Sequence, residues 1–275
     1  MFRIKAFAIA AVLLVIPSRG LAQASLDSLM NLAATYRHQE EYLKSNDCYE
    51  QLIDAIKDFD DGGLTGKIMG LMSLNYIYLG IPLLKEGDYE KAGPFFRKAV
   101  EYAKHDPKIA LSANSWMGQW YSMQSLDMRA RGTDLWRAVE YSLSAERYFE
   151  LAHAPEKRLN QQIARASTLS GLSRMTEAEQ LLQMTIRECE ERSGLEGQLA
   201  KALSELGKLE KNAENYQSAI FHLERSYEIG ISGDRQTARL AAVYLHELFE
   251  NMVPDKEKAA LWKMRIEELN DSPSI

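Results

Sequence analysis

The sequence predicts an all-α chain built from about six helical hairpins. Residues 200–230 show the pattern most plainly, since they read as two short helices with Gly207 in the first and Ala219 in the second. Small residues at these positions let two helix backbones approach closely. The composition agrees, because 46% of the 275 residues are hydrophobic, only seven are prolines, and no alternating β-branched run indicates a sheet. One such hairpin cannot bury its own apolar face, so further copies are expected along the chain.

Residues 1–24 have the pattern of a secretory signal. Arg3 and Lys5 precede an apolar run over residues 6–16, and Pro17 and a small-residue exit at 22–24 follow it. The run is short for a bilayer span, which favours a cleaved signal over an anchor; cleavage after Ala22 or after Ala24 remains open. Residues 25–275 are then expected to form a helical repeat domain that is periplasmic, secreted or surface-associated, with no stable membrane insertion.

The charge of the mature chain narrows the class of partner. Removing residues 1–22 takes away three basic residues and no acidic one, which leaves 30 basic against 39 acidic residues and a formal charge of about −9. A surface of this sign disfavours nucleic acid and anionic membranes as partners. Composition and charge leave the oligomeric state open.

Each hairpin has a small residue in its second helix, and the distance in sequence between these residues gives the repeat length. The spacings between these residues are 47, 46, 40, 41 and 41 residues. In order along the chain, the six small residues are Ser45, Ala92, Ala138, Ala178, Ala219 and Ala260. The hairpins that contain them are expected at about 26–59, 66–104, 108–153, 155–192, 196–230 and 235–270.

The second hairpin carries a resemblance to a known family. Leu79-Gly80, and the run from Gly87 to Ala92, stand at the spacing of the tetratricopeptide (TPR) repeat. The chain therefore resembles TPR proteins, although its units are longer than the usual period of 34 residues. The resemblance implies a right-handed α-solenoid of TPR-like hairpins with extended helices.

Two hairpins depart from the regular pattern. In the third, the first helix is expected to continue through Met128 and end near Gly132, with a Thr133 or Asp134 cap starting the next helix. The sixth is degenerate and charged, as is typical of a terminal repeat whose outer face meets water.

Prolines interrupt both helices of the second hairpin. Pro82 lies inside its first helix and Gly93-Pro94 inside its second, and each proline removes a backbone hydrogen bond. The two breaks are consistent with a shared bend that fits the superhelix. They are also consistent with a hinge or a site of ligand approach.

No catalytic, cofactor or metal motif is complete. Residues 62–67 (GGLTGK) resemble a phosphate loop but lack its hydroxyl residue and a preceding strand, and His246 is followed by Glu250 where a zinc-protease helix needs a second histidine. Cys48 and Cys189 are predicted to be lone core thiols rather than a disulfide. The sequence thus predicts a non-enzyme without cofactor or metal.

The TPR resemblance places the partner-binding groove on the first helix of each hairpin. It implies an apolar and aromatic region beside a basic patch, whereas the carboxylate clamp of some TPR proteins is absent. For any one of these residues, simple packing is an alternative. The predicted groove residues are Ile77, Tyr78, Trp116, Gln119 and Met123, with Lys201, Lys208 and Lys211 as the basic patch and Arg37 among the further groove positions.

Three functions are consistent with these features. The first is an exported scaffold that binds a protein or peptide segment in its concave groove without catalysis. The second, by resemblance, is the ligand-sensing half of a periplasmic TPR-containing regulatory system, without its own transmembrane and output domains. The third, an enzyme, has no acid, base or nucleophile constellation in its favour.

Overall fold

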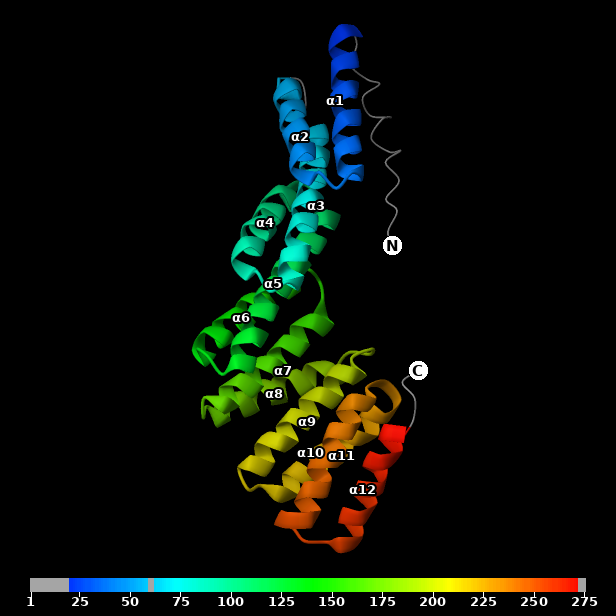
Figure 1. Cartoon of the computed structure of the whole chain (residues 1–275). Helices are drawn as coiled ribbons and strands as arrows, with labels where there is room; N and C mark the ends of the chain where they lie inside the picture. Colours follow the sequence, from blue (N-terminus) through cyan, green and yellow to red (C-terminus); the bar gives the residue numbers. More distant parts are fainter. Residues whose placement is uncertain (1–19, 59–61, 272–275) are drawn as a thin grey trace. The chain divides into compact units, whose positions relative to one another are not determined.

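The computed structural model describes residues 20–58 and 62–271, and within these ranges the chain has twelve α-helices and no strand (Figure 1). The all-α prediction is confirmed. Most of the predicted signal, residues 1–19, lies outside the described residues, whereas residues 20–24 begin the first helix. The helices are α1 Gly20–His38, α2 Tyr42–Ile56, α3 Gly63–Lys85, α4 Tyr89–Tyr102, α5 Pro107–Arg131, α6 Leu135–Leu151, α7 Pro155–Gly171, α8 Met175–Glu190, α9 Glu196–Asn212, α10 Tyr216–Gly233, α11 Arg235–Glu247 and α12 Lys256–Asp271.

Neighbouring helices pair as hairpins. Direct packing joins α1 to α2, α3 to α4, α7 to α8, α9 to α10 and α11 to α12. In the remaining pair, the Ser125 hydroxyl of α5 donates to the carbonyl of Ala138 in α6 at 2.8 Å. The chain forms two compact units, one of residues 1–120 with 151–153 and one of residues 121–150 with 154–275. The boundary falls within α5.

One hydrogen bond recurs at the start of every second helix. In each hairpin the N–H of a small buried residue donates to the carbonyl oxygen four residues earlier, at 2.9 to 3.1 Å, which fixes where the helix begins. The donor and acceptor pairs are Ser45 and Glu41, Ala92 and Asp88, Ala138 and Asp134, Ala178 and Arg174, Ala219 and Asn215, and Ala259 and Asp255.

The small residue of the sixth hairpin is therefore Ala259, and the prediction of Ala260 is wrong by one position. Ala259 is buried and Ala260 is exposed. The Asp255 side chain caps α12 by accepting from the Lys258 N–H at 3.1 Å, and this cap sets the phase of the helix. Two adjacent alanines gave the sequence pattern no means to distinguish them.

Glycines mark the points where paired helices come closest. A Cβ on Gly207 would lie 2.6 Å from Leu223 Cγ and 3.1 Å from the Ala219 carbonyl oxygen. In the second hairpin, a Cβ on Gly80 would lie 2.8 Å from the Phe96 ring. No real side chain fits such spaces, so the predicted close approach at Gly207 is confirmed.

In the third hairpin, the first helix ends and the second begins where the sequence predicts. Helix α5 ends at Arg131, and Gly132 has the left-handed φ of 64° expected after a helix terminus. Asp134, rather than Thr133, provides the cap, because its carboxylate accepts from the Arg137 N–H at 3.0 Å.

Helices α3 and α4 continue through Pro82 and Pro94. Close packing explains the glycine at position 93, because a Cβ there would lie 2.5 Å from Trp120 Cζ2. The Trp120 indole N–H also donates to the carbonyl of Tyr89 at 2.9 Å. Trp120 thus packs closely against the Gly93-Pro94 segment, and a bend or hinge at these prolines stays a prediction.

Helix α3 is long and apolar enough to cross a membrane, by length and composition alone. Half of that apolar stretch is buried in the fold, where α3 packs against α2 and α4. A core helix passes the same test, and core packing accounts for its composition.

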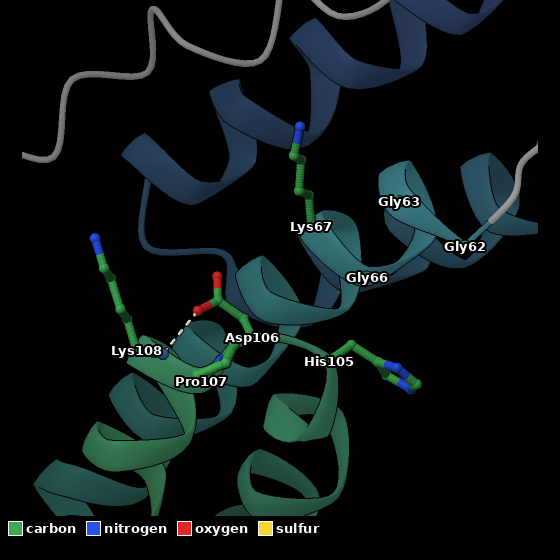
Figure 2. Close-up of a pocket in the computed structure, with 8 residues that line it drawn as sticks. All are labelled: Gly62, Gly63, Gly66, Lys67, His105, Asp106, Pro107 and Lys108. Atoms are coloured by element: carbon green, nitrogen blue, oxygen red, sulfur yellow. Dashed lines mark hydrogen bonds between the residues drawn. The ribbon is translucent and has the colours of Figure 1, made fainter.

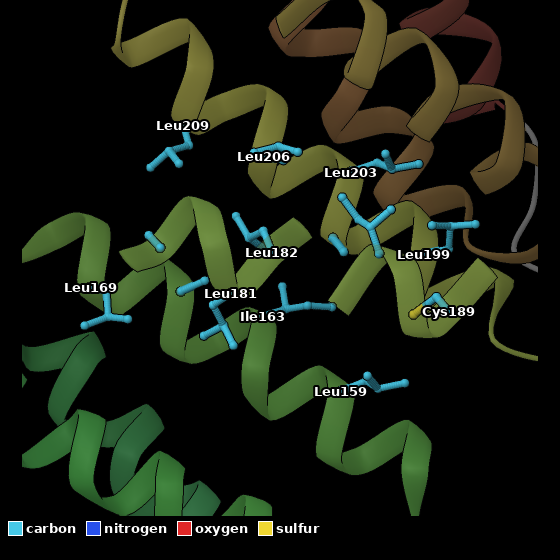
Figure 3. Close-up of a cluster of buried hydrophobic side chains, with 14 of the residues drawn as sticks. Leu159, Ile163, Leu169, Leu181, Leu182, Cys189, Leu199, Leu203, Leu206 and Leu209 are labelled. Carbon is cyan, nitrogen blue, oxygen red and sulfur yellow. The ribbon is translucent and has the colours of Figure 1, made fainter. Parts of the chain in front are cut away.

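In the second unit, leucines of α7, α8 and α9 form a continuous core, in which Cys189 also lies (Figure 3). Burial raises the pKa of the Cys189 thiol to about 11. Cys48 is likewise a free, buried thiol, in the core of the first unit. The prediction of lone core thiols is confirmed.

Candidate functional site

Tyr78 is the most exposed of the predicted groove residues in the first unit, at 42% of its surface. It lies on α3, and its ring stacks on Tyr42 of α2 with centroids 5.4 Å apart. The Arg37 guanidinium at the end of α1 lies 5.9 Å from the Tyr78 ring centroid. Burial, followed by the charges of Glu40 and Tyr78, raises the pKa of the Tyr42 hydroxyl, which therefore stays protonated. Three consecutive helices thus contribute to one aromatic and cationic surface.

Trp116 and Gln119 on α5 are half-buried. The Trp116 ring stacks parallel to Phe96, with centroids 6.3 Å apart, and Phe96 is fully buried. Trp116 therefore covers the core with one face and leaves part of its surface open. An exposed Tyr78 and a partly exposed Trp116 match the predicted exposure of the two aromatic residues.

Ile77 does not belong to an exposed site. It is only 3% exposed and forms part of the core of the first unit. One residue is a 100° step around a helix, so the residue before an outward-facing tyrosine can face the core. Met123, which is half-buried, belongs to the second unit and not to the surface around Tyr78.

The predicted basic patch of the second unit is neutralised by acidic partners. Lys201 pairs with Asp234 at 3.1 Å, Lys208 with Glu205 at 3.5 Å, and Lys211 with Glu247 at 2.7 Å. The Lys211 side chain is only 10% exposed and lies over the Tyr244 ring. Lys211 is therefore a nearly buried structural cation, whereas Lys201 and Lys208 are paired with acids but stay 42% and 37% exposed.

In the pair of Lys201 with Asp234, hydrogen bonds stabilise the charged form of the carboxylate. Burial raises the pKa of its carboxyl, but hydrogen bonds from Thr237 and Lys201 outweigh this effect, and the pKa lies below its ordinary value. Asp234 also caps α11 by accepting from the Thr237 N–H at 3.1 Å. The acidic partners of Lys201 and Lys211 lie 33 and 36 residues away, and that of Lys208 lies one helical turn away, so no charge run in the sequence revealed them.

The glycine-rich segment at residues 62–67 lines a hollow of about 470 Å³ with His105, Asp106, Pro107 and Lys108. Figure 2 shows that the side chains of Lys67, His105 and Lys108 point in different directions rather than toward one point. Gly62, with a φ of 94°, forms the turn into α3. The segment is a turn between helices, and these side chains provide no convergent phosphate site.

The second incomplete motif is also structural. His246 Nδ1 lies 3.0 Å from the Ala259 carbonyl oxygen, and Nε2 lies 3.5 Å from Glu250. Among the residues that the structure describes, no three His, Cys, Asp or Glu side chains gather to hold a metal ion.

Comparisons with known proteins bear on the fold. No family model matches the sequence, and no curated protein matches it. Among solved structures, BtubC (BKLC) from P. vanneervenii is similar with a TM-score of 0.57 and 18% identity, over 91% of this chain and 94% of that one. The apo form of RapI is similar with a TM-score of 0.58 and 13% identity, over 90% and 77%. A Rap protein complexed with Competence and Sporulation Factor gives 0.50 and 13%, over 90% and 78%.

The fold is that of a TPR-like repeat protein. The predicted resemblance is confirmed at the level of fold, because the repeated hairpins and their glycine contacts accompany these structural likenesses. At such low sequence identity the TPR-like fold is shared, while binding residues have to be found in this chain itself. Arg37 was among the predicted groove positions, whereas Tyr42 was not.

Proposed function

We propose that this TPR-like chain is an exported scaffold that binds an extended segment of a protein or peptide and has no chemistry of its own. The observation that carries the proposal is the exposed, stacked Tyr78 on a first helix of the repeat. Exposure alone does not distinguish Tyr78, because Phe221 is 60% exposed, but Tyr78 combines exposure with an ordered, stacked ring on a first helix. Tyrosine and tryptophan dominate the energy of protein interfaces.

The rigidity of the surface supports the same proposal. Tyr78 is held by Tyr42, and Trp116 is held by Phe96, so both rings are ordered before a partner arrives. Ordered side chains lose little conformational entropy on binding. A protein of similar fold, the Rap protein, has been solved in complex with Competence and Sporulation Factor, which shows that such a fold can accept a bound factor.

Export is part of the proposal. It rests on the signal pattern at residues 1–24, and the mature chain would begin at Gln23 or Ser25. Cleavage at either place removes at most residues 20–24 from α1 and keeps the buried Leu26. N-terminal sequencing of protein from the native cell tests this point, and an intact Met1 would contradict it.

Affinity capture from the periplasm of the native cell tests the binding function. We expect Tyr78→Ala and Trp116→Ala each to weaken capture by about 2 kcal/mol, roughly 30-fold. The helical melt should change little for Tyr78→Ala, whereas Trp116→Ala should also lower the melting temperature, because the Trp116 ring covers buried Phe96. Phe221→Ala is the matched control, because Phe221 is 60% exposed on the second helix of its hairpin. Undiminished capture by both variants, or loss of capture by the control, would contradict the assignment.

The alternative function, ligand sensing, requires a second protein. A ligand-sensing half would have to associate with a separate membrane protein that carries the output domain. Capture of a membrane-embedded regulator would favour this role, whereas capture of soluble partners alone would favour the scaffold.

A further inference from the structure

Arg37 is a half-buried cation surrounded by tyrosines. Its guanidinium lies over Tyr78, its charge acts on Tyr42, and its side chain hydrogen-bonds the hydroxyl of buried Tyr49. Arg37 also lies in the last turn of α1, where the helix dipole stabilises a positive charge. The guanidinium is thus fixed in position by neutral groups.

Among the described residues, Arg37 has no acidic partner; in this it differs from Arg158 and Arg165 and resembles Arg265, which lies over the rings of Tyr227 and Trp262. Arg158 pairs with Glu188, and Arg165 bonds Glu146 through two nitrogens at 2.7 and 3.0 Å. Throughout the described ranges 20–58 and 62–271, no carboxylate forms an ion pair with Arg37. Its five N–H donors are more than the Tyr49 hydroxyl can satisfy. The Arg37 guanidinium therefore has N–H donors left that a carboxylate could accept from.

The polar layer beneath these rings is also incomplete. Asn75 Nδ2 donates to Asn46 Oδ1 at 2.8 Å and to Ser45 Oγ at 3.1 Å. Asn46 Nδ2 and Asn75 Oδ1, both buried, have no partner in the structure. Tyr42 precedes Asn46 by one helical turn and Tyr78 follows Asn75 by nearly one turn, so the stacked rings share helix faces with this pair. Unsatisfied buried polar atoms are rare in native proteins, and a bound water commonly provides the missing partner.

We propose that Arg37, on the face of Tyr78, binds a carboxylate of the extended peptide segment that the scaffold recognises. The guanidinium is planar by resonance, and with an aromatic ring against one face its edge can still bind a carboxylate through two parallel hydrogen bonds. The stacked tyrosines then contact an apolar residue next to the acidic one. The inference rests on the proposed function and adds the chemistry of the partner.

Charge favours an acidic peptide over other anions. The net charge of −6 repels a polyanion such as nucleic acid, whereas a single carboxylate needs only one local cation. Close to Arg37 in the chain, Glu41 is already paired with Lys44 at 2.9 Å, and the charge of Glu40 raises the pKa of the Tyr42 hydroxyl. These two carboxylates disfavour a run of acidic residues in the ligand. One acidic group, not a run of them, fits this surface.

The test uses the full-length mature chain and short synthetic peptides blocked at both ends, with one central glutamate flanked by leucine and alanine. We expect saturable binding of this peptide by calorimetry or tyrosine fluorescence, and binding weaker by about tenfold when the glutamate is replaced by glutamine. Arg37→Gln should abolish this preference and bind both peptides as wild type binds the glutamine peptide. Arg97→Gln is the matched control, since Arg97 lies 5.8 Å over the Trp120 ring in the same unit.

Further peptides identify the source of the carboxylate. A glutamine peptide with a free C-terminus competes with the glutamate peptide if the site takes a terminal carboxylate, and fails to compete if it takes a side chain. Circular dichroism of Arg37→Gln confirms that the variant is folded; should it fail to fold, Arg37→Lys takes its place, because it keeps the charge and loses the two-pronged geometry.

The outcomes separate this inference from the proposed function. If wild type binds both peptides equally, or Arg37→Gln keeps the preference for glutamate, the carboxylate inference falls. If, in addition, partner capture from the periplasm still depends on Tyr78, the scaffold function stands without it. If the glutamate peptide does not bind at all, the inference is overturned regardless of the capture result.

Discussion

Gly207→Leu tests the packing on which the repeat depends. The new Cβ would lie 2.6 Å from Leu223 Cγ and 3.1 Å from the Ala219 carbonyl oxygen, about 1 Å inside ordinary contact distance. Leu223 is fully buried, so its side chain has no free space to enter, and a backbone oxygen moves only with its helix. Overpacking of this kind costs about 1 to 3 kcal/mol or more, partly offset by the better helix propensity of leucine, which is worth nearly 1 kcal/mol.

For a chain of this size, each kcal/mol lowers the melting temperature by about 2 to 4 °C. Thermal melts followed by circular dichroism should therefore show a clear loss for Gly207→Leu. Lys208→Ala is the control on the adjacent residue, because it removes only a 3.5 Å pair with Glu205 on a half-exposed side chain, worth less than about 1 kcal/mol. Equal melting temperatures for the two variants would refute the reasoning about helix phase.

Three further predictions use the same melts or a simple reaction. Glu214 has a left-handed φ of 61°, so Glu214→Gly should stabilise the fold by about 0.5 to 1 kcal/mol, and Gly87→Ala, at a φ of 79°, should destabilise it by a similar amount; shifts of the same sign would contradict this. Asn75→Leu should cost about 1 to 3 kcal/mol by stranding Asn46, whereas adding Asn46→Leu should recover part of the loss, and strictly additive effects would show that the two amides act independently. With a pKa of about 11 instead of 9, Cys189 has about 100-fold less thiolate near pH 8, so iodoacetamide should modify it at least that much more slowly in the native than in the denatured protein; equal rates would indicate that α8 opens locally.

Much of the fold could be predicted because it depends on local rules. The small residues at Gly207 and Ala219 stand at a spacing that only a helical hairpin explains, and the cap at Asp134 follows from the chemistry of helix starts. The error at Ala260 arose where two alanines stand together and the five-residue π-helical segment Leu248–Met252 follows α11. A π-helical turn shifts the register of the following residues, and the sequence contains no distinct signal for it.

The site was harder to predict because exposure depends on tertiary neighbours. Tyr78 and Ile77 are adjacent and both large, yet only packing against the core of the first unit decides which of them is open. The lysines of α9 looked like a basic patch because Asp234 and Glu247, which neutralise Lys201 and Lys211, lie in later segments. The pairing of Arg37 with tyrosines in two other helices likewise follows from the hairpin turn and not from any motif.

The hydrogen bond that starts every second helix has a consequence for how this chain could have evolved. The second helices all begin three residues before their small buried residue, while the first helices range from 13 to 25 residues. Insertions and deletions are thus tolerated in the first helix, because the turn and its cap restart the register for the next one. A gene duplication or crossover that copies a unit of about 40 residues carries its own starting bond with it, so whole hairpins can be gained or lost while their neighbours keep their phase.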